Sequence, residues 1–214
     1  MIHFHIISLF PEAIEAYLSV SILGRAQKNK HIKVSYYNPR DFTIDKHGRT
    51  DEKPYGGGPG MVMTAIPILR AVKKASGKKK NVGVILLSPQ GKSFNQKDAK
   101  TFSEKYKDII LISGRYEGID ARVEKILKPK VISVGEYVLT GGELPSAIII
   151  DAVSRNLKGV LGDEFSVEDK RIAGKDVYTR PQKLEWGKKS HAVPTVLMSG
   201  HHKKIEDFRK KSKK

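Results

Sequence analysis

Three glycine-bearing loops, each directly after a short apolar segment, are the part of the sequence with the most chemical content. The loops are Ser88–Gly91, Ser113–Gly118 and Gly135–Gly142. Glycine lets the backbone adopt positive φ and approach a ligand closely. Loops of this kind can therefore present backbone N–H and C=O groups to a polar, nucleoside-like ligand.

A short acidic segment, Asp163–Asp169, is a second candidate for chemistry. It carries four carboxylates within seven residues, and carboxylates can act as general bases. Taken on its own, a solvated acidic loop is the simpler interpretation.

The elements around the glycine loops determine whether the loops meet. The apolar segments Val82–Leu87, Ile109–Ile112 and Val131–Val134 predict strands, and helix-like stretches lie between them at about Asn95–Tyr106 and Ile119–Leu127. Alternating strands and helices predict an α/β fold with a parallel sheet. Ligands bind beyond the carboxyl ends of such strands, so we expect the loops to converge on one pocket. The alternative is that they are ordinary strand-to-helix turns.

The remaining elements follow from the same patterns. Further strands are expected at Ile2–Ile7 and Ile32–Tyr37, and further helices from Pro11 to about Gly24, over Ala65–Ser76 and over Leu144–Asn156. Residues 38–63 form a long polar loop. Its glycine-rich part, Pro54–Met61, contains prolines that favour an ordered loop near the site.

The chain is expected to have two domains. Residues 1–160 would form the first domain, residues 161–176 a linker, and residues 177–214 a short, basic and mostly helical second domain.

Several familiar sites are missing from the sequence. No P-loop, no G-x-G-x-x-G after the first strand and no G-x-S-x-G elbow is present. We expect no metal site either. His201 and His202 are adjacent and point different ways, and His3 and His5 have no carboxylate or third histidine at ligand spacing. We therefore interpret His3 and His5 as structural.

Composition and charge narrow the class of protein. The chain has 214 residues, 39% of them hydrophobic, no cysteine and a net charge of +17. The lack of cysteine, of a signal peptide and of a long apolar run favours a cytoplasmic protein that does not enter a membrane. The basic excess predicts a polyanionic partner such as nucleic acid, although a lysine-rich solvated surface is the simpler alternative. The excess lies in residues 1–80 and 151–214, whereas residues 81–150 are nearly neutral.

Seven blocks in order along the chain resemble the bacterial tRNA (guanine-N1)-methyltransferases that modify position 37, beside the anticodon. The blocks are Ser8–Pro11, Pro39–Thr43, Pro54–Met61, Leu87–Gly91, Gly114–Asp120, Gly135–Pro145 and Tyr178–Pro181. The longest, G-R-Y-E-G-I-D and Y-V-L-T-G-G-E-L-P, are specific. The main departures are a shortened linker around Asp163–Asp176 and a C-terminal part that stops soon after Phe208.

The resemblance implies a SPOUT-type parallel sheet with a deep trefoil knot, which no periodicity would predict. It also implies S-adenosylmethionine as the methyl donor, tRNA as the substrate and a homodimer with shared active sites. The cofactor-binding residues it implies are Leu87, Ser88, Pro89, Gln90, Gly114, Tyr116, Glu117, Gly118, Val134, Gly135, Glu136, Tyr137, Val138, Leu139, Gly141, Gly142 and Pro145.

Guanine N1 carries a proton at neutral pH, so its methylation calls for a general base and for stabilisation of charge at O6. By resemblance, Asp169 is the base and Arg155 contacts the guanine, with Glu168 as the substitute if the alignment across the shortened linker is wrong. The counterpart of Glu117 lies near the methionine part of the cofactor and a magnesium ion, so Mg²⁺ could be needed for activity. Capping of the next helix is the alternative role for Glu117.

Two other functions fit the sequence less well. One is a knotted methyltransferase that acts on a ribosomal RNA base or a ribose 2′-OH, for which removal of the N1 proton would be unnecessary. The other is a non-catalytic basic RNA-binding protein, against which the intact loop motifs argue.

Overall fold

The computed structural model of the chain describes residues 1–161 and 176–211. The chain divides into two compact units, Met1–Leu161 and Gly162–Lys214, and each is described by itself. Among the described residues, no helix is both long and apolar enough to cross a membrane.

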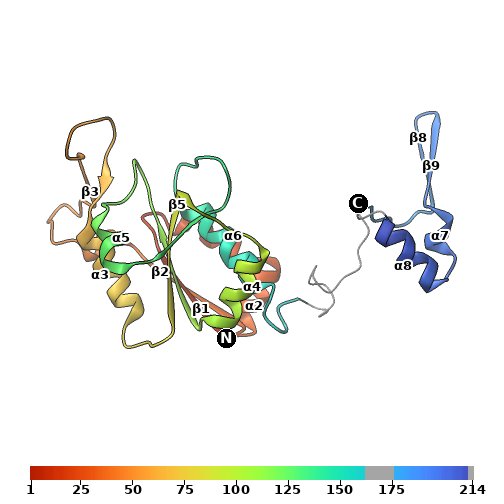
Figure 1. Ribbon diagram of the computed structural model, residues 1–214, viewed down its shortest axis with the longest axis horizontal. Helices are drawn as coiled ribbons and strands as arrows, with labels where there is room; N and C mark the ends of the chain where they lie inside the picture. The colour runs from red at the N-terminus through yellow and green to blue at the C-terminus, as the bar shows by residue number, and fades with distance from the viewer. Residues whose placement is uncertain (162–175, 212–214) are drawn as a thin grey trace. The chain divides into compact units, whose positions relative to one another are not determined.

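A five-stranded parallel sheet forms the centre of the first unit (Figure 1). Its strand order is β2-β1-β6-β5-β7. The strands are β1 Ile2–Ile7, β2 Ile32–Tyr37, β5 Val82–Ser93, β6 Asp108–Ser113 and β7 Lys130–Ser133. The predicted α/β fold with a parallel sheet is therefore confirmed.

Helices cover both faces of this sheet, as expected for strands that are apolar on both sides (Figure 1). One face carries α1 Glu12–Leu18, α2 Ser21–Lys28, α4 Gln96–Lys105 and α6 Glu143–Ser154. The other face carries α3 Ala65–Ser76 and α5 Arg122–Leu127. A short 3₁₀ helix, η1 Pro39–Phe42, and a two-stranded pair, β3 Asp51–Glu52 with β4 Val62–Met63, belong to the long polar loop.

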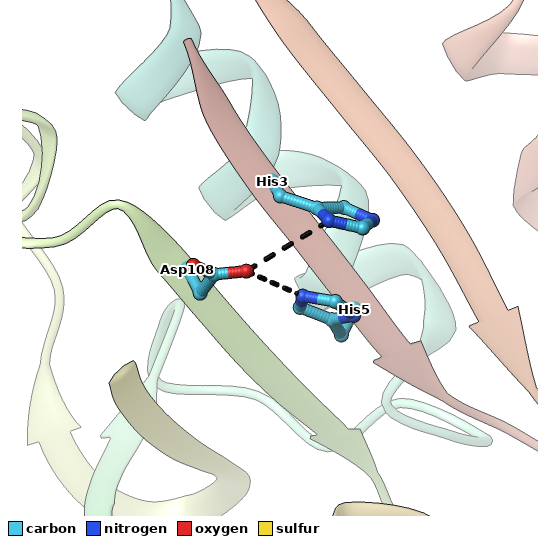
Figure 2. A group of neighbouring side chains, drawn as sticks. All are labelled: His3, His5 and Asp108. Atoms are coloured by element: carbon cyan, nitrogen blue, oxygen red, sulfur yellow. Dashed lines mark hydrogen bonds and ion pairs between the residues drawn. The ribbon is translucent and has the colours of Figure 1, made fainter. Parts of the chain in front are cut away.

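The register between β1 and β6 sets Asp108 opposite His3. His5 lies on the same face of β1, and its Nε2 is 2.8 Å from Asp108 Oδ1 (Figure 2). The expectation that no carboxylate accompanies these histidines is therefore wrong. Asp108 comes 103 residues after His5 in the chain, and only the pairing of the two strands brings them together.

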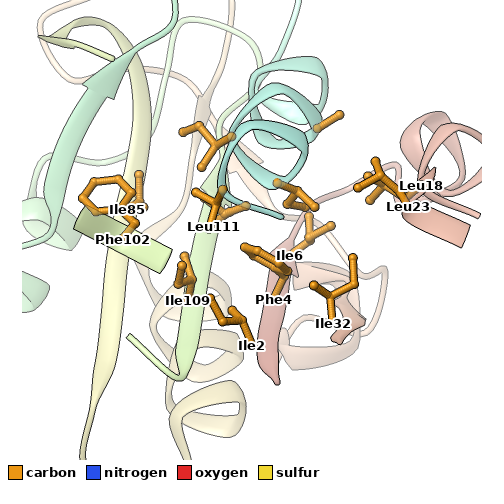
Figure 3. Packing of buried hydrophobic residues seen from close by; sticks show 14 of the residues in the cluster. Ile2, Phe4, Ile6, Leu18, Leu23, Ile32, Ile85, Phe102, Ile109 and Leu111 are labelled. Carbon is orange, nitrogen blue, oxygen red and sulfur yellow. The ribbon is translucent and has the colours of Figure 1, made fainter. Parts of the chain in front are cut away.

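Alternation along β1 divides the apolar core between the two faces. Ile2, Phe4 and Ile6 are buried in the cluster that contains residues of α1, α2, α4 and α6 (Figure 3). Ile7 belongs to the opposite cluster, with α3 and α5. Each fully buried side chain of this size stabilises the fold by roughly 1.5–3 kcal/mol, so this double-sided core holds the strand ends in a fixed arrangement.

Two elements differ from their predicted bounds. The helix expected from Pro11 to Gly24 is divided into α1 and α2 by Val20, which is extended. Gly24 permits this break, since a Cβ there would lie 2.2 Å from the carbonyl oxygen of Ser19. Strand β5 continues to Ser93 beyond the predicted turn, with a register shift between Leu87 and Lys92.

The second unit contains a β-hairpin that the sequence analysis did not predict. Strands β8 Lys183–Trp186 and β9 Lys189–Ala192 pair in antiparallel fashion around Gly187, which has a φ of 61°. Two-residue hairpin loops favour such a glycine. The helices of this unit are α7 Thr195–Met198 and α8 His202–Lys211.

Candidate active site

The three glycine loops leave the carboxyl ends of neighbouring strands, β6, β5 and β7. The loop Ser88–Gly91 interrupts the pairing of β5 with β7. Leu87, before the loop, and Lys92, after it, both pair with Ile132 of β7. Gly91 makes this return possible, since a Cβ there would lie 2.5 Å from the backbone of Ile132. The loop is therefore anchored beside the end of β7, where the loop Gly135–Gly142 begins shortly after.

The loop after β6 is held between two other loops. On one side, Gly142 N donates a hydrogen bond to Gly114 O at 2.9 Å, and Arg115 forms a bridge with Gly141. On the other side, Glu117 N donates to Met61 O at 3.0 Å. The loop Pro54–Met61 thus contacts the loop after β6 through Met61. The three glycine loops lie at the same edge of the sheet, as predicted, and the two that follow β6 and β7 are in direct contact.

Arg115, in the loop after β6, and Glu143, directly after the loop Gly135–Gly142, form a charged cluster. Glu143, at the start of α6, is buried, and its Oε2 lies 2.9 Å from Arg115 Nε as an ion pair without hydrogen-bond alignment. Its Oε1 accepts a 2.7 Å hydrogen bond from the Ser8 hydroxyl. The Arg115 guanidinium also lies 4.8 Å from the centre of the Phe10 ring, a favourable cation–π distance.

This charged cluster connects the end of β1, the loop after β6 and the helix α6. None of its members is among the site residues predicted from the sequence. All of them lie in blocks that carry the resemblance, but no local spacing indicates that Ser8 and Glu143 touch across 135 residues.

Glycines let the loops pack this closely. A Cβ on Gly142 would lie 2.6 Å from Ser113 Cα, which is backbone and cannot move aside. A Cβ on Gly141 would lie 2.4 Å from Arg115 Nε. Gly118 differs from both, because it has a φ of 124° and open space around its Cβ position.

The predicted cofactor residues fall into a buried group, a half-buried group and an exposed rim. Leu87, Gly142 and Pro145 are buried. The half-buried residues are Ser88, Gly114, Gly118, Val134, Gly135 and Gly141, and the exposed ones are Pro89, Gln90, Tyr116, Glu117, Glu136, Tyr137, Val138 and Leu139. The rim therefore offers two aromatic rings and two carboxylates to a ligand.

Of the two predicted catalytic residues, the structure describes Arg155. Arg155 is half-buried directly after α6, and its backbone N–H donates to Asp151 O at 3.1 Å. Asp169 and its substitute Glu168 lie outside the described residues.

At the exit of the loop after β6, a hydrogen bond from the Arg122 guanidinium holds the pKa of the Asp120 carboxyl below its usual range. Asp120 Oδ1 also accepts a 2.9 Å hydrogen bond from Arg122 N. The ionised carboxylate thus pairs with the first backbone N–H of α5, whose N-cap residue Ala121 has no side-chain capping bond.

Comparison with known proteins agrees with this geometry. The profile of the family described as tRNA (Guanine-1)-methyltransferase TrmD matches residues 2–214. A tRNA (guanine-N(1)-)-methyltransferase of Carboxydothermus hydrogenoformans is 47% identical over 96% of this chain and 80% of its own length. One from Clostridioides difficile is 46% identical over 97% of this chain and 90% of its own length.

A solved structure is similar over nearly the whole chain. The crystal structure of the tRNA (m1G37) methyltransferase from Aquifex aeolicus has a TM-score of 0.80 and 36% identity, and the match covers 97% of this chain and 87% of that one. With the order of the motifs and the convergence of the loops, these similarities show that the chain belongs to the tRNA (guanine-1)-methyltransferase TrmD family.

Proposed function

We propose that this protein transfers the methyl group of S-adenosylmethionine to N1 of the guanosine at position 37 of tRNA. The observation that carries the proposal is the convergence of three glycine loops at neighbouring strand ends in a chain of this family. The name of the structural relative, an m1G37 methyltransferase, supports the position on the tRNA.

The residues at the loops fit S-adenosylmethionine. Gly118 leaves its backbone open on the side where a Cβ would stand. The exposed carboxylates of Glu117 and Glu136 can face a cationic ligand, whereas the nearby Arg115 is already paired with Glu143. The bound cofactor supplies an electrophilic methyl group. The proposal includes a divalent ion such as Mg²⁺, which the Glu117 carboxylate would hold.

The chain's own groups do the remaining work on the guanine. Asp169 accepts the N1 proton, and Arg155 stabilises the charge that moves towards O6. The loops exclude water and fix the orientation of the two reactants, which is a large part of the rate enhancement when the electrophile needs little activation.

The homodimer with shared sites belongs to this proposal as well. Large apolar side chains are exposed next to the loops, with Val138 at 81%, Leu144 at 56% and Ile148 at 37% of full exposure. Exposed apolar residues gathered in this way favour a protein interface. Leu144 and Ile148 are four residues apart on α6 and so share one side of that helix.

The assignments to domains are those that the resemblance to the family implies, and the basic excess in residues 151–214 supports contact with tRNA there. Residues 1–160 bind the cofactor within the SPOUT-type knotted sheet, residues 161–176 link the domains, and residues 177–214 contact tRNA through basic side chains in the cytoplasm.

The test is a methyl-transfer assay on tRNA transcripts, followed by nucleoside analysis. We expect 1-methylguanosine in transcripts with G37 and none when G37 is replaced by adenosine. A 2′-O-methyl product, or product only on ribosomal RNA, would assign the protein to a different reaction.

A further inference from the structure

Three side chains of types that bind metals gather near the amino ends of β1 and β6, whereas the glycine loops follow the carboxyl ends of the strands. His3 and His5 come from β1, and Asp108 is the first residue of β6 (Figure 2). One ligand atom from each residue lies within 4.8 Å of the other two, and no other such group of three occurs in residues 1–161 and 176–211.

Both imidazole rings are oriented by hydroxyl groups of the neighbouring strand β2. His3 Nε2 is 2.8 Å from Ser35 Oγ, and His5 Nδ1 is 3.2 Å from Tyr37 Oη. His5 Nε2 also donates a 2.8 Å hydrogen bond to Asp108 Oδ1 in the structure as it stands. Metal binding requires the other tautomer, in which the hydroxyls accept the ring N–H groups and the lone pairs lie on the nitrogens that face Asp108. Metal-bound histidines are usually oriented by a second-shell hydrogen bond of this kind.

The remaining nitrogens face one carboxylate oxygen. His5 Nε2 lies 2.8 Å and His3 Nδ1 lies 3.8 Å from Asp108 Oδ1. Two ligands at about 2.0–2.1 Å from a tetrahedral zinc ion are roughly 3.3 Å apart, so the observed separations lie on either side of that value. The two rings are tilted by 36° with their centroids 3.8 Å apart, so binding of one ion also requires the rings to move apart.

The exposure of the cluster also suits a metal ion. His5 is fully buried, whereas the His3 and Asp108 side chains are each 17% exposed and give access from solvent.

Lys33 and Lys79 place positive charge near the cluster, and this charge disfavours the binding of any cation. Imidazole ligands nevertheless suit zinc, whereas Mg²⁺ and Ca²⁺ prefer oxygen ligands. The cluster should therefore discriminate between these ions.

We propose that His3, His5 and Asp108 form a zinc-binding site that fastens β1 to β6, with a fourth ligand position open to water. This site is separate from the proposed methyl-transfer site, because it lies at the amino ends of the strands. The two can therefore fail independently.

The test uses the full chain after treatment with a chelator, with Zn²⁺ alone as the probe in calorimetry and metal analysis. We expect one zinc ion per chain, a rise in Tm on adding zinc, and no response to Mg²⁺. His3→Gln and Asp108→Asn should each weaken zinc binding roughly 100-fold or more, and Ser35→Ala roughly 10–100-fold through the lost second-shell contact.

The matched control is the double variant His201→Gln with His202→Gln, which removes an exposed histidine pair and should keep full zinc binding. Circular dichroism identifies a variant that does not fold. If Asp108→Asn does not fold, the test depends on the zinc affinity of His3→Gln, because His3 is partly exposed. Zinc binding that survives His3→Gln, that disappears in the control, or that never reaches one ion per chain would overturn the proposal.

Discussion

Arg115 Nε and Glu143 Oε2 lie 2.9 Å apart and connect the loop after β6 to the start of α6. Glu143 is 3% exposed and also accepts a hydrogen bond from Ser8 at the end of β1. Because Arg115 belongs to the loop after β6 and Glu143 directly follows the loop Gly135–Gly142, the pair holds in place the backbone on which the proposed cofactor binding depends.

Removal of one partner from this pair should destabilise the fold strongly. Arg115→Met leaves the buried carboxylate of Glu143 without its cation, and the loss of one partner of a buried pair costs about 3 kcal/mol. Urea unfolding measures this as a lower midpoint with an unchanged slope.

Arg122→Met is the matched control, since the ion pair of Arg122 with Asp120 is exposed and the unfolding midpoint should hardly move. A double variant, Arg115→Met with Glu143→Leu, should recover part of the loss because no charge is left buried alone. Equal midpoints for Arg115→Met and Arg122→Met would contradict the role given to the buried pair.

Two glycines of the loops should respond differently to the same substitution. The Cβ of Gly142→Ala would meet the Ser113 backbone at 2.6 Å, whereas that of Gly114→Ala would only touch the Ile119 side chain at 3.4 Å. We expect Gly142→Ala to abolish S-adenosylmethionine binding and Gly114→Ala to remain folded.

Calorimetry with the cofactor, together with thermal unfolding, separates the two glycine effects. If Gly114→Ala is folded but does not bind, the cofactor itself occupies the space beside Gly114. A Gly142→Ala protein with normal stability and binding would show that the loops are not packed as described.

The sheet and its loops were predictable from sequence because they depend on local patterns. Runs such as Val82–Leu87 are short, apolar and followed by glycine, and that combination indicates a buried parallel strand and its turn. The hairpin around Gly187 was missed because its strands are only four residues long and all their residues are exposed. Leu184 and Trp186 alternate with polar residues in β8, but β9 shows no such alternation.

The clusters of charged and polar side chains were not predictable in this way. Glu143 meets Ser8, and Asp108 meets His5, only through the register and order of strands that are distant in sequence. Composition and spacing contain no information on that order. In the case of His3 and His5, this led to the wrong conclusion that no carboxylate is near.

Stability should decrease at alkaline pH because of Tyr36. Burial raises the pKa of Tyr36 to about 12, above the value near 10 of an unfolded chain. The unfolded state therefore releases a proton that the folded state keeps, so this contribution is present below pH 10 and is lost as the pH rises towards 12.

The difference in unfolding free energy between the wild type and Tyr36→Phe isolates the effect. It should change by about 1–2 kcal/mol across that interval. A constant difference from pH 9 to 12 would mean that Tyr36 titrates alike in both states.

The proposed shared site of the dimer predicts complementation. If Asp169 and Arg155 of one site come from opposite subunits, a mixture of inactive Asp169→Asn and inactive Arg155→Ala chains should regain activity at one composite site. Mass spectrometry of the heterodimer checks that subunits exchange. If the heterodimer is inactive, Asp169 and Arg155 of each site come from the same subunit, and the proposed sharing is wrong.

The last prediction concerns the general base. Guanine N1 must lose its proton near the moment of methyl transfer, and Asp169→Asn keeps the shape of the side chain while removing its basicity. We expect cofactor binding to be unchanged and the single-turnover rate at saturating tRNA to fall by roughly 10²–10⁴. Glu168→Gln is the matched control and should lower the rate far less. The reverse pattern would make Glu168 the base, with the alignment across the shortened linker displaced by one residue. If both variants keep the wild-type rate, no carboxylate of this pair takes the proton, and the carboxylate mechanism fails for this chain.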